Sequence, residues 1–168
     1  MSISYRKANF KDLKDILEAF YNSKEILSHQ GTGQWQDGSP SEQSFIDDIN
    51  NGNSYLLLNN NSIVGVCALT YKEEDYEYPY EGKWLSNYDY MVMHRVAIKK
   101  EYYGKGFGLE FFKLFENVAK EKGYSSIRID THEGNKIMKH LIEKAGFNYC
   151  GKVILKPNKD RIIYEKII

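Results

Sequence analysis

Residues 94–108 read HRVAIKKEYYGKGFG. The strand-like run Tyr88–Lys99 leads into three glycines, Gly104, Gly106 and Gly108, and a helical pattern with apolar residues on one side follows. Glycines at the start of a helix let the backbone turn sharply, so that N–H groups point outward and the helix dipole adds partial positive charge. The stretch therefore predicts an anion-binding turn, with an ordinary tight strand-to-helix turn as the alternative.

Two well-known phosphate-binding motifs do not match this turn. A P-loop requires Ser or Thr directly after its Gly-Lys pair, but Lys105 is followed by Gly106 and Phe107. A dinucleotide-binding fingerprint that starts at Gly104 would require glycine at position 109, which is Leu109. The sequence therefore excludes both motifs.

Strand and helix patterns alternate through the rest of the chain. Asn9 and Asp12 predict a capping box before a first helix, and Pro40 and Glu42 are expected at the first and third positions of a second helix. Residues 72–87 form a long polar connection. The other expected strands are 2–8, 55–58, 63–71, 126–131, 147–155 and 161–168, and a last helix is expected over 135–145. A parallel crossover over 90–131 among antiparallel hairpins predicts an α/β fold with a mixed sheet.

Composition narrows the class of protein. The chain has 168 residues, with 23 Lys and Arg against 23 Asp and Glu. This length predicts a single domain over residues 1–168, and the balanced charge argues against a nucleic-acid partner. The two cysteines, Cys67 and Cys150, lie in apolar surroundings and are expected to be reduced thiols. Without a long apolar run, we expect no signal peptide, no membrane span and a cytoplasmic location.

The balanced total hides an asymmetry. Residues 1–94 carry a net charge of −7, and residues 95–168 carry a net charge of +7. We therefore expect the two halves to meet partners of opposite charge.

The sequence resembles the GNAT superfamily of acetyl-CoA-dependent N-acetyltransferases. The glycine turn fits the family's central motif, except that Tyr103 stands where the family has Arg or Gln. A second motif matches Asn135, Leu141, Glu143 and Gly146-Phe147, and the segments Gly82–Leu85 and Ile127–Asn135 look like an uncharacterised bacterial branch. The resemblance implies a GNAT-type acyl-CoA N-acyltransferase fold with about seven strands, a central splayed pair of strands and four helices.

The resemblance also implies a cofactor site for acetyl-CoA. The pantetheine arm would pair with backbone groups along Val96, Ala97 and Ile98, and the pyrophosphate would lie on the turn. Asn135 matches the family's cofactor-side asparagine, although an asparagine there is equally expected as a helix cap. Lys99, Lys100 and Lys105 could counter the phosphates, although lysines on such a loop are often only solvated. The implied residues of the turn are Tyr103, Gly104, Lys105, Gly106, Phe107 and Gly108.

Transfer of an acetyl group to an amine requires removal of a proton from the amine. His94 is the candidate base, because it precedes Val96 by two positions, where many family members carry a catalytic Glu or His, and an unperturbed imidazole titrates near pH 6.5. The alternative is a histidine that is satisfied by packing. The chain departs from the family at Ile142, where many relatives have a general-acid tyrosine. Tyr149 and His132 are the possible substitutes for it, and no metal site is expected.

The acceptor is expected to be a small-molecule amine or a peptide N-terminus. The segment 73–81 interleaves five acidic side chains with three tyrosines, which would suit a cation, although a solvated loop is the simpler interpretation. Trp35, Tyr90 and His132 are candidate acceptor contacts. A noncatalytic acyl-CoA-binding sensor or interaction module on the same fold is the alternative function. The apolar C-terminal run IIYEKII is compatible with a homodimer.

Overall fold

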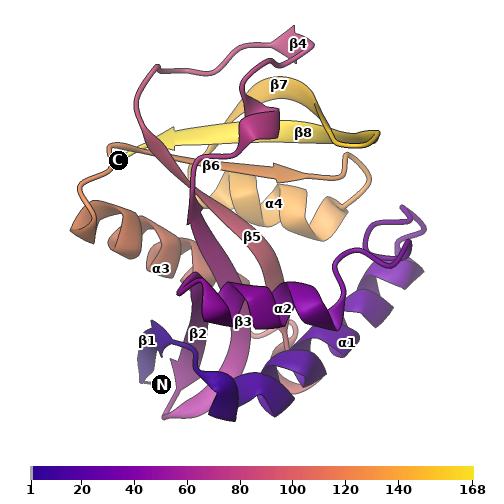
Figure 1. Cartoon of the computed structure of the whole chain (residues 1–168), viewed down its shortest axis with the longest axis vertical. Helices are drawn as coiled ribbons and strands as arrows, with labels where there is room; N and C mark the ends of the chain where they lie inside the picture. Colours follow the sequence, from indigo (N-terminus) through magenta and orange to yellow (C-terminus); the bar gives the residue numbers. More distant parts are fainter. Residues whose placement is uncertain (1) are drawn as a thin grey trace. The chain divides into compact units, whose positions relative to one another are not determined.

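The computed structural model describes residues 2–168 and divides them into two compact units. Unit 1 contains the chain up to Leu69 and His94–Leu114, and unit 2 contains Thr70–Met93 and Phe115–Ile168. Within the described residues, four α-helices accompany a mixed sheet of eight strands in the order β1-β2-β3-β5-β6-β8-β7-β4 (Figure 1). Three elements run from one unit into the other: β3 (Ser62–Tyr71), β5 (Tyr90–Ile98) and α3 (Phe107–Glu121).

The strands of unit 1 form an antiparallel meander. β1 (Ile3–Lys7) pairs with β2 (Ser54–Asn59), and β2 pairs with β3. The predicted hairpin is confirmed, and its turn residues Asn60 and Asn61 adopt φ values of 51° and 68°. Asparagine tolerates this left-handed conformation better than most residues, which suits these two positions to the turn.

The helices of unit 1 begin close to their predicted caps. The Asn9–Asp12 capping box is confirmed, although it caps a short 3₁₀ turn (Phe10–Asp12) that continues into α1 (Leu13–His29). α2 spans Glu42–Asn50 with Ser41 as its N-cap. The expectation that Pro40 and Glu42 are the first and third helical residues was therefore wrong, because Ser41 is the N-cap, Glu42 is the first residue of the helix and Pro40 lies outside it.

The core of unit 1 lies between α1, α2 and one face of the meander. Because side chains of a strand alternate between faces, Leu56 and Leu58 of β2 point to the same side of the sheet. Phe20 of α1 and Phe45 of α2 pack against them, with ring centroids 4.7 Å apart. The buried members of this cluster are Ile16, Ala19, Phe20, Phe45, Ile49, Leu56, Leu58, Val66 and Ala97.

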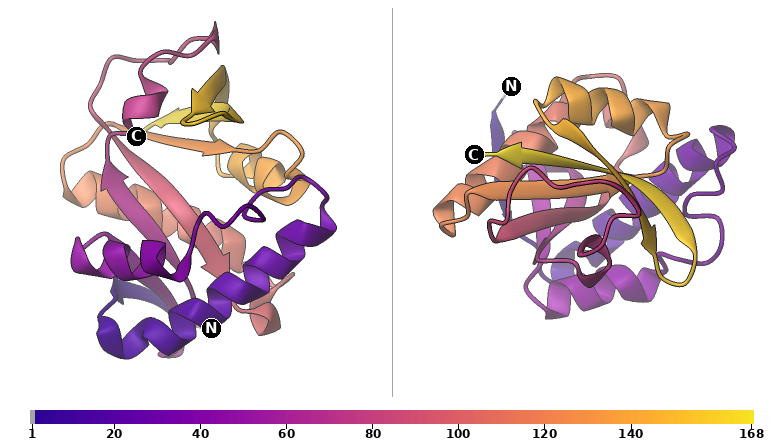
Figure 2. Two further views of the ribbon diagram at one scale, coloured as in Figure 1. Left: turned by 45° about the vertical axis from the view of Figure 1, so that its right-hand side comes forward. Right: turned by 90° about the horizontal axis from the view of Figure 1, so that it is seen from above.

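Unit 2 is built on β6 (Ser126–Thr131), β8 (Lys159–Ile167) and β7 (Asn148–Leu155), which are antiparallel neighbours. The predicted parallel crossover is confirmed, since Tyr90–Val92 of β5 pairs in parallel with Ser126–Arg128. α4 (Lys136–Lys144) lies on one face of these strands, and the segment that follows β3 lies on the other (Figure 2).

Residues 72–87 carry more structure than a polar connection would. They form a 3₁₀ turn, η2 (Glu74–Tyr76), and a short strand, β4 (Glu81–Gly82), which pairs with β7. Tyr76 is fully buried, and Trp84 packs against the same cluster. The segment is therefore a cover for one face of the unit 2 sheet, and β4 is an eighth strand beyond the seven expected.

Candidate functional site

The residues predicted for the site fall in both units. Unit 1 carries His94, the β5 residues Val96–Ile98, the turn Tyr103–Gly108 and Trp35. Unit 2 carries Tyr90, His132 and Asn135.

The glycine turn has the backbone geometry that the sequence predicts. Gly104 and Gly106 adopt φ values of 72° and 87°, in the left-handed region that favours glycine. A Cβ atom added at either position would meet no atom within 4 Å, so conformation, not crowding, requires glycine there. α3 begins directly afterwards at Phe107, and the first N–H groups of a helix have no partner within it. The turn therefore has the open, amide-rich form of an anion site.

The end of β5 shows which edge of the strand is turned toward α1. The N–H of Lys99 donates to the carbonyl of Val64 in β3. Because backbone groups alternate along a strand, Val96 and Ile98 present theirs on the opposite edge. There the N–H of Ile98 donates to Ser23 Oγ at 3.0 Å, and the Ser23 hydroxyl lies 3.3 Å from the Ile98 carbonyl oxygen.

Two neighbouring residues of α1 also hold the start of the turn. Ser23 Oγ lies 3.3 Å from the Tyr103 hydroxyl, and Asn22 Oδ1 accepts the N–H of Lys100 at 2.8 Å. Burial raises the pKa of the Tyr103 phenol, which keeps it neutral. Tyr103 thus contributes a hydrogen bond to α1 where the family places a cationic or amide side chain.

The lysines near the turn divide into two kinds. Lys99 is buried and forms ion pairs with Asp15 at 2.6 Å and Glu18 at 3.1 Å, so its charge is used within unit 1. Lys100 and Lys105 are exposed. Of the three lysines expected to counter phosphates, these two keep solvent-facing ammonium groups.

An irregularity of the β5 backbone lies beside the candidate base. Arg95 adopts a φ of 50°, which a residue with a Cβ atom rarely takes. Its guanidinium binds Asp48 of α2 through two hydrogen bonds of 2.7 and 2.6 Å. Sequence reasoning missed this pair, because 47 positions separate the partners and nothing local marks either of them.

His94 is half-buried on β5, directly before Arg95. Burial, and then the positive charge of Arg95, lower the pKa of its imidazole to about 3. The side chain is therefore neutral at pH 7. The expectation of an unperturbed pKa near 6.5 was wrong, because it took no account of burial.

Trp35 lies in the loop between α1 and α2 with a φ of 66°. Its ring is 5.8 Å from Phe20 and 6.5 Å from Phe45, measured between centroids. These contacts give the indole a packing role in unit 1, and its contact with an acceptor stays a prediction.

In unit 2, Tyr90 and Asn135 both have structural partners. Tyr90 is buried, and its hydroxyl contacts the backbone N–H and carbonyl of Glu73. Asn135 Oδ1 accepts the N–H of Met138 and caps α4, which is one of the two roles that the sequence left open. The cofactor role of Asn135 and the acceptor role of Tyr90 stay predictions.

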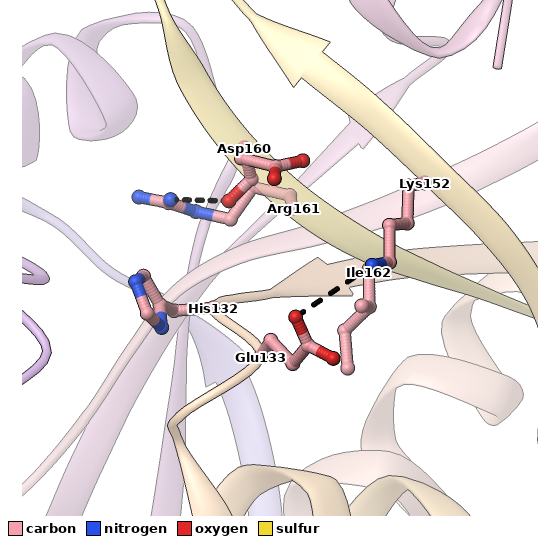
Figure 3. A pocket seen from close by; sticks show the side chains of 6 residues that line it. All are labelled: His132, Glu133, Lys152, Asp160, Arg161 and Ile162. Atoms are coloured by element: carbon pink, nitrogen blue, oxygen red, sulfur yellow. Dashed lines mark hydrogen bonds and ion pairs between the residues drawn. The ribbon is translucent and has the colours of Figure 1, made fainter. Parts of the chain in front are cut away.

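His132 follows β6 and lines an open pocket of unit 2 (Figure 3). Its Nδ1 accepts the N–H of Gly134 at 2.9 Å. Burial, and then the charge of Arg161, lower the pKa of the imidazole. Tyr149, the other substitute for a general acid, is half exposed and donates its hydroxyl to Glu81, while Ile142 is fully buried.

The acidic segment 73–81 is largely occupied by its own contacts. Asp75 Oδ2 accepts the N–H of Lys156, Glu77 pairs with Lys72, and Tyr80 donates its hydroxyl to Asp160. These contacts favour a structural role and leave little support for an acidic surface that attracts a cation.

Beneath that segment lies a buried ion pair that sequence reasoning also missed. The Arg128 guanidinium is stacked between Trp84 and Tyr90, at 4.1 and 4.0 Å from the ring centroids. Its Nε lies 3.5 Å from the fully buried Glu165 carboxylate, which accepts the Leu85 N–H at 2.7 Å. The pair therefore fixes the 82–87 segment to the sheet of unit 2.

Two features of residues 2–168 bear on other classes of function. This part of the chain contains no cluster of three or more His, Cys, Asp or Glu side chains suited to a metal ion. None of its helices is both long enough and apolar enough to cross a membrane. Cys67 and Cys150 are buried free thiols, as expected.

Comparisons with known proteins agree with the fold. The model of the acetyltransferase (GNAT) family matches residues 12–147. An acetyltransferase of the GNAT family from Streptococcus agalactiae is 32% identical, with a TM-score of 0.89 over 99% of this chain and 95% of that one. No curated protein matches the chain.

Two more distant structures share the fold. The PaiA N-acetyltransferase of Thermoplasma acidophilum, solved with coenzyme A, is 21% identical, with a TM-score of 0.67 over 100% of both chains. A GNAT-family acetyltransferase from Listeria monocytogenes is 18% identical, with a TM-score of 0.74 over 99% of this chain and 95% of that one. The family match over residues 12–147 and the 32% identity above show that the chain belongs to the GNAT family of acetyltransferases.

Proposed function

We propose that the protein moves an acetyl group from acetyl-CoA to a primary amine, by direct attack of the amine within a ternary complex. The observation that carries the proposal is the glycine turn, where two left-handed glycines open toward solvent at the N-terminus of α3. A relative of the same fold was solved with coenzyme A, which supports this choice of anion.

The chain's own residues fit such a cofactor. The amides of Tyr103–Gly108 would receive the pyrophosphate, and Lys105 adds a solvent-facing positive charge. The outward edge of β5, from Val96 to Ile98, would pair with the pantetheine arm. Acetyl-CoA supplies a thioester whose carbonyl carbon accepts the amine. Asn135 of unit 2 is proposed on the cofactor side, in addition to its cap.

His94 is proposed to handle the proton of the attacking amine. With a pKa near 3, the imidazole accepts a hydrogen bond but does not retain a proton at neutral pH. We therefore propose that it passes the proton on to water instead of storing it. Because Ile142 is buried and has no proton to donate, the thiolate is proposed to leave without a tyrosine acid.

The proposed reaction also bears on the domain organisation, the acceptor and the cellular location of the protein. We propose that residues 1–168 act as one acetyltransferase domain, and that the acceptor is a small amine or a peptide N-terminus. The buried, unpaired thiols of Cys67 and Cys150 agree with the cytoplasmic location that the sequence predicts. A homodimer remains a prediction.

Binding and turnover together test the proposal. Saturation with acetyl-CoA at about 100 times its Kd stabilises the protein by roughly 2.7 kcal/mol, a shift of several degrees in Tm. Release of free thiol over a panel of amines and peptides then separates an enzyme from a noncatalytic acyl-CoA sensor. Absence of the thermal shift contradicts both functions, whereas a shift without thiol release for any acceptor favours the sensor.

Replacement of His94, the proposed base, tests its role in the reaction. His94→Gln is expected to lower kcat by about 10²-fold or more and to leave the Kd of acetyl-CoA within about twofold of the wild type. Equal turnover of the variant and the wild type removes His94 from the mechanism.

A further inference from the structure

The hydroxyl of Ser23 on α1 has three hydrogen-bonding neighbours at the end of β5, all within unit 1. Its Oγ accepts the N–H of Ile98 at 3.0 Å and donates to the carbonyl oxygen of the same residue at 3.3 Å. The third neighbour is the Tyr103 hydroxyl, also at 3.3 Å. A serine hydroxyl donates one hydrogen and accepts two, so Tyr103 is the donor in the last contact. One oxygen atom therefore serves both backbone groups of Ile98.

The three contacts differ in strength. The bond from the Ile98 N–H has an ordinary length, whereas both contacts between oxygen atoms are longer than the usual range of about 2.5–3.0 Å. A serine side chain also has other staggered positions about its Cα–Cβ bond. The hydroxyl is therefore able to give up Ile98 and keep Tyr103 as its partner.

The backbone groups that Ser23 occupies are those that a neighbouring strand would use. In a sheet, a residue pairs through its N–H and its carbonyl with the chain beside it. A ligand amide offers the same acceptor and donor, and the pantetheine arm of coenzyme A contains such amides. Because a hydroxyl combines an acceptor and a donor on one atom, Ser23 is an internal substitute for a ligand amide at Ile98.

Other contacts hold α1 against the end of β5 without the Ser23 hydroxyl. Asn22 Oδ1 accepts the N–H of Lys100 at 2.8 Å. The ammonium of the buried Lys99 lies 2.6 Å from a carboxylate oxygen of Asp15. The serine hydroxyl can therefore change its partner while α1 stays in place.

We propose that Ser23 is a positioning residue of the cofactor site and has a different partner in each state of that site. In the empty protein its hydroxyl holds the N–H and the carbonyl of Ile98. When a pantetheine amide pairs with Ile98, the hydroxyl turns to Tyr103, which gives a role to the tyrosine that stands in place of the family's Arg or Gln. This inference rests on the proposed acetyltransferase function, because it concerns the cofactor site of that reaction.

Two ligands that differ only in the pantetheine arm test this exchange of partners. Dephospho-coenzyme A is ADP joined to the arm, so the Kd of ADP divided by the Kd of dephospho-coenzyme A measures the contribution of the arm. Ser23→Ala removes the competing hydroxyl from Ile98, and its contact with Tyr103 is lost from both states. We expect the ratio to rise about fivefold in Ser23→Ala, the effect of about one net hydrogen bond. A ratio that stays the same or falls overturns the inference.

Ser28→Ala is the matched control on the same helix. The Ser28 hydroxyl is exposed and donates to the Glu25 carbonyl at 2.6 Å, a bond that lies within α1. The ratio for this variant should equal that of the wild type. An equal rise in Ser23→Ala and Ser28→Ala would be a general effect of α1 and would also overturn the inference.

Tyr103→Phe removes the second partner. We expect the ratio to fall about threefold, because the Ser23 hydroxyl then has no phenol to turn to when the arm binds. In the Ser23→Ala background the same substitution should leave the ratio within about twofold, since no hydroxyl remains to turn. The same fall in both backgrounds would mean that Tyr103 acts on the arm without Ser23, which contradicts the exchange.

Hydrogen exchange of the Ile98 amide, followed by NMR on the whole protein, reports the contact itself. In the empty protein we expect this amide to exchange about 10-fold faster in Ser23→Ala than in the wild type. Dephospho-coenzyme A should slow the exchange in Ser23→Ala, whereas ADP should not. Equal exchange rates in the empty wild type and the empty variant contradict the proposed hold of Ser23 on Ile98.

Failure of this inference and failure of the proposed function give different results. Thiol release by the wild type, together with an unchanged Kd ratio in Ser23→Ala, contradicts the inference and leaves the acetyltransferase function standing. A wild type that binds neither acetyl-CoA nor dephospho-coenzyme A contradicts the proposed function and, with it, the inference.

Discussion

Asp48 of α2 binds the guanidinium of Arg95 with both carboxylate oxygens, at 2.6 and 2.7 Å, at a residue whose φ of 50° disfavours every side chain with a Cβ atom. A left-handed non-glycine residue costs about 1–3 kcal/mol and persists only where its surroundings hold it. The two hydrogen bonds to Asp48 provide such a hold. The shape of β5 next to His94 thus depends on a helix from an earlier part of the chain.

Removal of the Asp48–Arg95 ion pair should make the folded protein less stable. Asp48→Ala is expected to lower the free energy of unfolding by about 3 kcal/mol, because the charge of Arg95 is left without its partner in a half-buried position. Urea unfolding measures the change. In a double-mutant cycle, Arg95→Ala added to Asp48→Ala should cost clearly less than Arg95→Ala alone. Additive effects would show that the pair is not coupled.

The glycine turn should respond to alanine in both stability and cofactor binding. Gly104→Ala and Gly106→Ala each place a side chain at a positive φ, which costs about 1–2 kcal/mol of stability although no atom is crowded. Relaxation of that strain moves the turn amides, so the Kd of coenzyme A should rise at least 10-fold. Isothermal titration calorimetry gives the Kd.

Gly123→Ala is the control for the turn. Gly123 has a φ of 84°, and an added Cβ atom meets nothing there, so the variant carries the same backbone penalty outside the turn. Its Kd for coenzyme A should equal that of the wild type. If Gly104→Ala and Gly106→Ala match Gly123→Ala in affinity as well as in stability, the turn does not hold the cofactor.

The low pKa of His94 should make stability depend on pH. The folded protein keeps the imidazole neutral down to about pH 3, whereas the unfolded chain takes up a proton near pH 6.5. The stability that this neutral group contributes is therefore present above pH 6.5 and is lost as the pH falls toward 3. Between pH 7.5 and pH 5 the loss amounts to about 2 kcal/mol.

His94→Gln does not titrate and isolates this effect. Denaturant unfolding at several pH values should show that the wild type loses about 2 kcal/mol more than the variant between pH 7.5 and pH 5. Parallel pH profiles of the two proteins would mean that His94 is as easily protonated in the fold as in the unfolded chain.

Replacement of Arg128 by a residue with a small side chain should destabilise unit 2. Arg128→Ala leaves the fully buried Glu165 carboxylate without its cation and opens a space between Trp84 and Tyr90, so we expect a loss of about 3–5 kcal/mol. Arg128→Lys restores the charge without the planar stack and should recover only part of it. Thermal unfolding followed by circular dichroism compares the three proteins. Full recovery in Arg128→Lys would show that charge alone matters.

The elements that are predicted most accurately from the sequence are those that depend on residues close together in the chain. The hairpin formed by the strands predicted at 55–58 and 63–71 and the strand 126–131 occupy their predicted places, because turn residues and alternation act over a few positions. The glycine turn belongs to the same group, since its φ values depend on which residues can adopt them.

What sequence reasoning missed depends on contacts between distant segments. Tyr76 was grouped with an acidic surface loop, yet it is fully buried, because Trp84, Tyr90 and Asp130 surround it in three dimensions. The pKa of His94 and the backbone of Arg95 likewise follow from burial and from the Asp48 contact. Contacts of this kind leave no periodic pattern in the sequence.

The hydroxyl of Ser23 occupies part of the β5 edge that is proposed to bind the cofactor. Its hydroxyl already occupies the N–H of Ile98, one of the backbone groups that the family resemblance offers to pantetheine. Ser23→Ala would remove this hydrogen bond from the Ile98 N–H and would also remove the contact with the Tyr103 hydroxyl. A ligand that pairs with the Ile98 N–H therefore has to displace the Ser23 hydroxyl from it.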